Sequence, residues 1–192
     1  MTENASAYLG AWSSFYAMTG TAAASLTGLM FVVITLVTRI ERRPDAQDGI
    51  GTFSTPTVVH FCAALFVSAV LAAPWHTLIY PAVFIGLVGF CGIMYVSRIM
   101  YRTRRLSFYI ADLEDWIWYA ILPWLSYAVV FAGAIFLAKA PSQALFALAA
   151  GALFQIFIGI RNAWDVVTYI ATGRADQPRP SQEVSDQRPR EL

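Results

Sequence analysis

The arginines of this chain gather at the ends of every second apolar stretch. Five long apolar stretches alternate with polar segments, and arginines come at or after the ends of the first, third and fifth. These are Arg39, Arg42 and Arg43, then Arg98, Arg102, Arg104 and Arg105, then Arg161, Arg174, Arg179, Arg188 and Arg190. If each stretch crosses a membrane once, twelve of the 13 basic residues lie on one side and only Lys139 on the other. Because cytoplasmic loops are enriched in Lys and Arg, the pattern predicts an outside N-terminus and a cytoplasmic C-terminus.

The apolar stretches have the length that a membrane helix needs, which is about 20 residues. The chain is 58% hydrophobic and 13% charged, whereas a soluble domain carries about 25% charge. We therefore predict an all-α integral membrane protein, a bundle of five transmembrane helices. The predicted spans are residues 15–38, 57–77, 82–101, 116–138 and 143–160, and the last continues as a cytoplasmic helical extension.

The predicted bundle occupies residues 15–172 and leaves a segment at each end. Residues 1–14 are expected to be extracytoplasmic. Residues 173–192 are rich in charge and proline and cannot bury enough apolar surface to offset their ordering entropy, so we predict a disordered cytoplasmic tail. The loop 39–56 is expected to be irregular because it contains four helix breakers. These are Pro44, Gly49, Gly51 and Pro56.

Polar side chains at membrane depth gather on two of the predicted spans. In the fifth, Gln155 and Asn162 share one helical face, and in the first, Thr21, Ser25 and Thr35 form a stripe. An amide in hydrocarbon has to find a hydrogen-bond partner, because an unpaired one is costly there. One interpretation is packing, in which the amide bonds to a neighbouring helix. The other is a polar path that these five residues line together.

The fourth span carries aromatic side chains beside a proline. Tyr119, Pro123 and Tyr127 lie on one helical face, with Trp124 next to them. Pro123 has no backbone N–H, so a kink is expected there. The face would either bind an apolar ligand, form a hydrophobic gate, or serve as ordinary packing. In the fifth span, Arg161 and Asp165 have the i,i+4 spacing of an ion pair.

The sequence offers no set of residues for catalysis or for cofactor binding. It contains no HExxH motif, no GxSxG motif and no P-loop. The predicted spans hold no carboxylate that could couple transport to protons. His60 and His76 are about four helical turns apart, too far to ligate one metal within one subunit. We therefore predict no enzyme activity, no cofactor and no metal.

The charges predict contact with lipid or protein rather than with nucleic acid, since the net charge is only +1. Arginines beside membrane helices suit anionic headgroups or a cytoplasmic protein partner. The candidates for these contacts are Arg39, Arg42, Arg43, Arg102, Arg104 and Arg105. Twelve arginines against one lysine are typical of a GC-rich bacterial genome. The expected location is therefore a bacterial inner (plasma) membrane.

Two functions fit these features. The leading hypothesis is a passive channel or transport-like homo-oligomer whose polar path contains Gln155 and Asn162. The alternative is a non-conducting accessory or sensor protein that binds a partner, anionic lipid or an apolar ligand. The first needs a wet interior, whereas the second needs exposed cytoplasmic or apolar binding surfaces.

Overall fold

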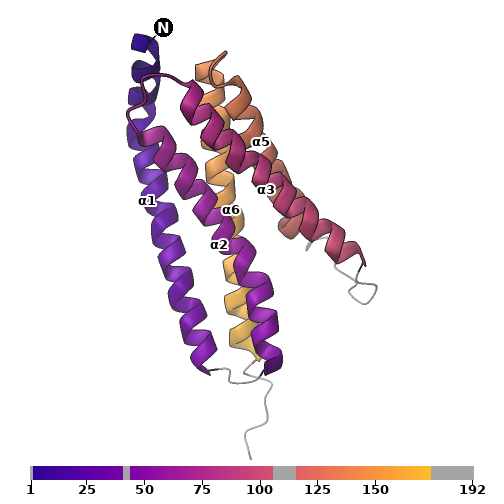
Figure 1. The fold of residues 1–192 in the computed structure, drawn as a ribbon. Coiled ribbons are helices and arrows are strands. Elements are labelled where there is room, and N and C mark those ends of the chain that lie inside the picture. Colours follow the sequence, from indigo (N-terminus) through magenta and orange to yellow (C-terminus); the bar gives the residue numbers. More distant parts are fainter. Residues whose placement is uncertain (1, 41–43, 106–115, 174–192) are drawn as a thin grey trace, which may run out of the picture.

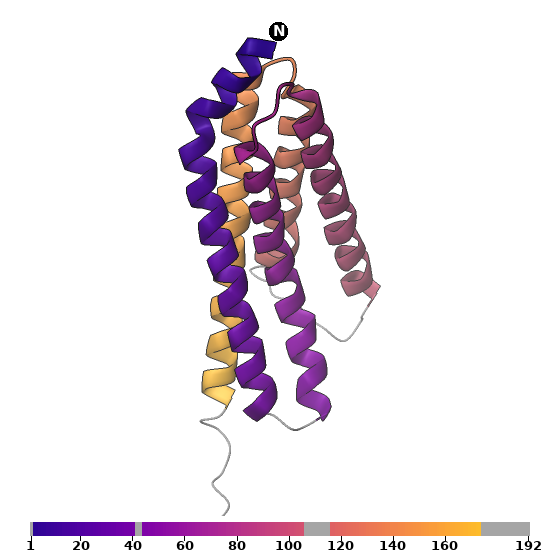
Figure 2. The ribbon, with the colours of Figure 1, turned by 60° about the vertical axis from the view of Figure 1, so that its left-hand side comes forward.

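The computed structural model describes residues 2–40, 44–105 and 116–173, and every regular element in these ranges is helical. The elements are α1 (Thr2–Ile40), α2 (Pro44–Ala72), α3 (Ile79–Arg105), the π-helical turn η1 (Ile117–Ile121), α5 (Leu122–Phe136) and α6 (Pro141–Gly173). In the bundle α1 packs on α2, α2 on α6, α6 on α5, and α5 on α3 (Figure 1). The helices α1, α2 and α6 extend beyond the α3–α5 pair at the end opposite the N-terminus (Figure 2).

Within the part of the chain that the structure describes, four helices are long and apolar enough to cross a membrane. Their apolar stretches are Ala5–Thr35, Ile79–Tyr101, Ile117–Phe136 and Pro141–Asp165. Large apolar side chains also cover their outer surfaces: Leu87 is 60% exposed and Phe157 is 58% exposed. Apolar surface of this extent requires an apolar environment. The predicted all-helical fold is thus confirmed for the described residues, and the four long helices indicate a membrane protein. In α2 the described apolar stretch, Pro56–Ala72, is shorter and has 17 residues.

The helices begin earlier than the sequence predicts. The expectation of an irregular loop over 39–56 is wrong from Pro44 onward, because α2 begins there. A proline in the first turn costs little, since the N–H it lacks would have no helical partner. Glycine lowers helix propensity by only about 1 kcal/mol, which the tertiary context can override. At the other end of the chain α1 begins at Thr2, so most of the segment 1–14 is helical too. Residues 174–192 of the predicted tail lie outside the described residues.

The helices approach each other closely at glycines. A Cβ atom on Gly89 of α3 would lie 2.8 Å from the backbone nitrogen of Phe131 in α5. A Cβ on Gly20 of α1 would lie 3.2 Å from that of Ser68 in α2. Helices in lipid gain no hydrophobic energy by associating, so close van der Waals contact between backbones has to hold them together. These glycines therefore define the spacing of α3 from α5 and of α1 from α2.

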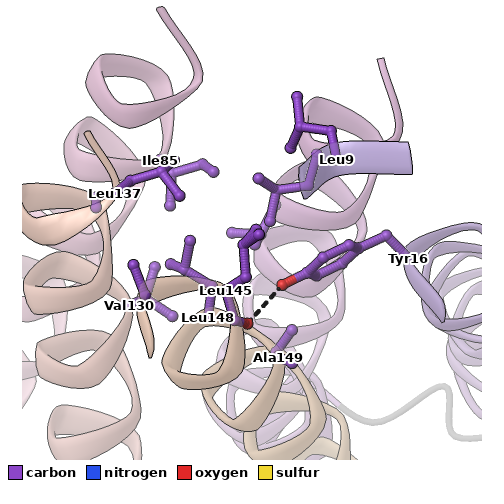
Figure 3. Close-up of a cluster of buried hydrophobic side chains, with 13 residues drawn as sticks. Leu9, Tyr16, Ile85, Val130, Leu137, Leu145, Leu148 and Ala149 are labelled. Carbon is purple, nitrogen blue, oxygen red and sulfur yellow. Dashed lines mark hydrogen bonds between the residues drawn. The ribbon is translucent and has the colours of Figure 1, made fainter. Parts of the chain in front are cut away.

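Of the three apolar cores among the described residues, two follow each other along the bundle, and the third is formed by Ala63, Val96 and Tyr127. The larger lies near the N-terminal end of the bundle and takes side chains from α1, α2, α3, α5 and α6. These include Leu9, Ile85 and Val130 (Figure 3). In it the hydroxyl of Tyr16 donates to the carbonyl of Leu145 at 2.9 Å, which fastens α1 to α6. The second core lies farther along and is built from α1, α2 and α6 only. Its buried members are Ala23, Met30, Phe61, Ala64 and Ile156.

We expect Gly89→Ala to destabilise the protein. The new methyl group would collide with backbone atoms of α5, which cannot rotate away as a side chain can, and overpacking of this kind costs about 1–3 kcal/mol. Thermal unfolding of the purified protein in detergent should show a lower Tm. Gly28→Ala is the matched control, because a Cβ at Gly28 meets nothing within 4 Å. Equal effects of the two substitutions would contradict this account of the α3–α5 contact.

Candidate functional site

Two amide side chains of α6 are sealed inside the bundle. Gln155 and Asn162 are both 0% exposed, and seven residues place them two turns apart on one side of the helix. Within the described residues, none of their four amide nitrogen and oxygen atoms has a hydrogen-bond partner. The interhelical hydrogen bond that the packing interpretation requires is therefore not formed in this arrangement.

The neighbouring glycines show where the Gln155 amide lies. One turn before it, a Cβ on Gly151 would meet Val130 of α5. One turn after it, a Cβ on Gly159 would meet the ring of Phe61 in α2. The Gln155 side chain thus lies inside the bundle, between the contacts that α6 makes with α5 and with α2. Burying an unpaired amide in an apolar medium costs about 2–7 kcal/mol, so a group outside the described chain is expected to satisfy it.

Two polar residues of α2 are also buried, and one of them, Ser68, lies against Gly20 of α1. Ser68 and Thr57 are both 0% exposed, and the hydroxyl of Ser68 has no hydrogen-bond partner among the residues that the structure describes. Because Phe61 of α2 lies against α6 at Gly159, positions along these two antiparallel helices can be measured from that contact. From it, Ser68 lies about 10 Å and Gln155 about 6 Å toward the N-terminal end of the bundle, at 1.5 Å per residue. Asn162 lies about 4 Å and Thr57 about 6 Å in the opposite direction.

A buried histidine–tyrosine pair lies near the level of the Phe61–Gly159 contact. The Nδ1 of His60 in α2 is 3.0 Å from the hydroxyl oxygen of Tyr127 in α5, and the two residues are only 2% and 1% exposed. The ring of Tyr127 occupies the space where any side chain at position 92 would be, so Gly92 of α3 has to be a glycine. One tyrosine therefore connects α2, α3 and α5. Sequence reasoning missed this pair, because its members are 67 residues apart.

A π-helical turn lies directly before Pro123, where the sequence predicts a kink. The amide of Leu122 donates to the carbonyl of Ile117, five residues back, instead of four. Such turns are rare and recur at functional sites. Tyr119 in this turn donates a long hydrogen bond of 3.4 Å to the carboxylate of Asp165 in α6. Asp165 also pairs with Arg161, so the ion pair predicted from the i,i+4 spacing is confirmed.

The hydroxyls predicted for the polar path lie on the outer surface of α1. Thr21, Ser25 and Thr35 are exposed, and each donates to the carbonyl four residues before it at 2.7–2.9 Å. Their hydrogen-bonding needs are thus met within their own helix. The structure brings Gln155 and Asn162 together in the interior, and it does not bring the three α1 hydroxyls to them.

The four aromatic-face residues do not converge either. Pro123 and Tyr127 are buried, Tyr119 points to Asp165, and Trp124 is 40% exposed on the outside. A separate apolar groove of about 520 Å³ lies between α5 and α6, and none of these four residues lines it. Its lining residues are Leu125, Ser126, Val129, Ala150, Gly151, Leu153, Phe154, Ile156, Phe157 and Ile160.

The candidate arginine contacts are only partly within the structure. Arg42 and Arg43 lie outside the described residues. Arg39 lies in the last turn of α1, and Arg102, Arg104 and Arg105 lie in the last turn of α3. The structure does not describe the side chains of these four residues. In the described ranges, no group of three or more His, Cys, Asp or Glu side chains is placed to hold a metal ion.

We expect Tyr127→Phe to lower stability while it keeps the ring on Gly92. The substitution leaves His60 buried without its partner, which costs about 1–3 kcal/mol. Thermal unfolding should show a clear fall in Tm, and His60→Leu combined with Tyr127→Phe should cost less than the sum of the two single changes. Tyr80→Phe is the control, because Tyr80 is 61% exposed. Additive effects would show that the two side chains do not interact.

The site therefore consists of uncharged donors and acceptors enclosed in an apolar bundle. Its members are Ser68, Gln155 and Asn162, next to the His60–Tyr127 pair. We call this set the polar seam. Comparisons of the chain with protein-family models, with curated proteins and with solved structures found no match.

Proposed function

We propose that this protein is a small transport-like membrane protein that lets solutes pass passively along the polar seam. The observation that carries the proposal is the pair of fully buried, unpaired amides at Gln155 and Asn162. Polar groups are expensive inside a membrane and mark solute pathways when they face the interior of a bundle. The absence of a carboxylate from the predicted spans favours a passive mechanism over a proton-coupled one.

The described arrangement fits a closed form of such a path, because neither amide reaches the surface. Opening requires helices to separate around the seam. The α3–α5 pair is the natural moving part, since it is shorter than the other helices (Figure 2). It contacts α2 through Tyr127, and it contacts α6 through Tyr119, Ser126 and Val130. The π-helical turn next to Tyr119 would absorb a change in the register of α5.

In this proposal α2 also crosses the membrane, which brings the number of transmembrane helices to five, and the N-terminus faces outward. Its apolar stretch is short, but α2 packs between α1 and α6, so much of its surface faces protein instead of lipid. The arginines then lie on the cytoplasmic side of a bacterial inner membrane. The outer face of α1, with its small residues Ser25 and Gly28, is where copies of the chain would associate into a homo-oligomer.

The function is tested by solute flux through purified protein in liposomes. We expect wild-type protein to raise the permeability of the vesicles, and Gln155→Leu to lower that flux about tenfold, the effect of losing one hydrogen bond of about 1.4 kcal/mol at the barrier. Gln143→Leu is a matched control on the same helix, because Gln143 is exposed. If no solute passes over a wide range of voltage and pH, the protein is not a passive transporter.

The orientation is tested separately with reporters fused after Leu192 and before Met1. Five spans and the arginine pattern predict that the C-terminal reporter is protected from external protease in intact cells, and that the N-terminal one is cleaved. Replacing Arg102, Arg104 and Arg105 together with glutamine should weaken this preference, since positive charge sets it. Finding both ends on the same side would rule out five spans.

The apolar groove between α5 and α6 favours a second candidate function, a non-conducting protein that binds an apolar ligand or lipid. Its volume lies within the range of small-molecule sites. Near one end of it, the guanidinium of Arg161 lies 5.6 Å from the centre of the Trp118 ring. Protein that conducts nothing but retains a lipid through purification would support this candidate over transport.

A further inference from the structure

We infer that the polar seam selects small neutral solutes that carry both hydrogen-bond donors and acceptors, such as water and urea, and that it rejects ions. This inference rests on the proposed function and names its substrate class. It follows from the chemistry of the groups that line the seam, from their spacing, and from the position of the nearest charges.

The groups that lack partners are complementary to such solutes. Each primary amide offers a carbonyl oxygen that accepts and an NH₂ group that donates two hydrogen bonds, and the hydroxyl of Ser68 does both. In Gln155 and Asn162 the amide nitrogen and the amide oxygen are all unpaired within the described chain. A solute has to donate and accept at the same place to satisfy both atoms. Water and urea do this, whereas a monatomic ion satisfies only one kind of atom.

The seam provides successive binding positions along the bundle. Ser68 and Gln155 differ by about 4 Å in height along the axis, and Gln155 and Asn162 by about 10 Å, at 1.5 Å per residue. The His60–Tyr127 pair lies between the two amides, about 1–2 Å from the Phe61–Gly159 level. A hydrogen-bonding solute would thus pass from one polar group to the next without crossing the full apolar thickness of about 30 Å alone.

No net charge is available in the seam to compensate an ion. The charged residues within one turn of Asn162 on α6 are Arg161 and Asp165, which pair with each other and are each about one-third exposed at the side chain. Burying an unpaired ion in an apolar interior costs far more than burying a neutral polar molecule. Channels that dehydrate cations do so with rings of carbonyl oxygens, whereas the buried side-chain carbonyl oxygens without a partner in the described residues are two, both on α6.

The test compares solute classes in liposomes that contain the full chain. Osmotic shrinkage followed by stopped-flow light scattering measures water and urea permeability, and ion-sensitive dyes measure K⁺, Na⁺ and Cl⁻ flux. We expect wild type to raise water and urea permeability severalfold above protein-free vesicles, with no rise in ion flux. Gln155→Leu and Asn162→Leu should each lower urea permeability about tenfold, and Gln143→Leu should leave it unchanged.

The outcomes distinguish a failure of the proposed selectivity from a failure of the proposed transport function. Ion flux that depends on Gln155 would overturn selectivity for neutral solutes but leave passive transport standing. No flux of any kind would overturn both. Neutral flux that persists in Gln155→Leu and Asn162→Leu would remove the seam from the path. If Gln155→Leu does not give a folded protein with a cooperative thermal transition, Gln155→Met, which keeps the side-chain length without the amide, takes its place.

Discussion

Lipid offers no hydrogen bonds, and this constraint organises the whole molecule. The backbone meets it by forming helices over most of the described ranges. The outward hydroxyls of α1 meet it by donating to their own helix, and Tyr16 and Ser126 meet it by donating to carbonyls of α6. Against this background of satisfied groups, the amides of Gln155 and Asn162 are exceptions. A buried polar group without a partner lowers stability, and such groups are expected where a protein binds or passes a polar molecule.

Glycine contacts set how closely neighbouring helices pack. Backbone meets backbone where Gly89 of α3 approaches Phe131 of α5, so these two helices behave as a tightly joined pair. The contact between α5 and α6 is as close, since a Cβ on Gly151 would lie 2.7 Å from Val130 and a Cβ on Gly133 would lie 2.9 Å from Leu148. Hydrogen bonds at Tyr127, Tyr119 and Ser126 also link the α3–α5 pair to α2 and α6.

The local pattern of the chain was sufficient for the helices but not for the site. Apolar stretches located the long helices, and the i,i+4 spacing located the Arg161–Asp165 pair. Polarity and spacing also placed Gln155 and Asn162 on one face, and both are buried. The same criteria selected Thr21, Ser25 and Thr35, which point outward. A hydroxyl can donate to a carbonyl of its own helix whether it faces the bundle or the outside, so its polarity does not reveal which way it points. Ser68 could have been found by its i,i+4 spacing from Ala64 on the face that packs against α1 and α6.

The sequence by itself determined the class of this protein, because apolar stretches of membrane length form helices through effects that act over a few neighbouring residues. It did not place the start of α2, which begins at Pro44 within the segment expected to be an irregular loop. Only the tertiary structure decided which polar groups meet and which remain unpaired. His60 joins Tyr127 across 67 residues and Tyr16 joins Leu145 across 129. Such pairs depend on how each helix is rotated about its axis, and that rotation is chosen by glycine-mediated packing between helices, which no single segment contains.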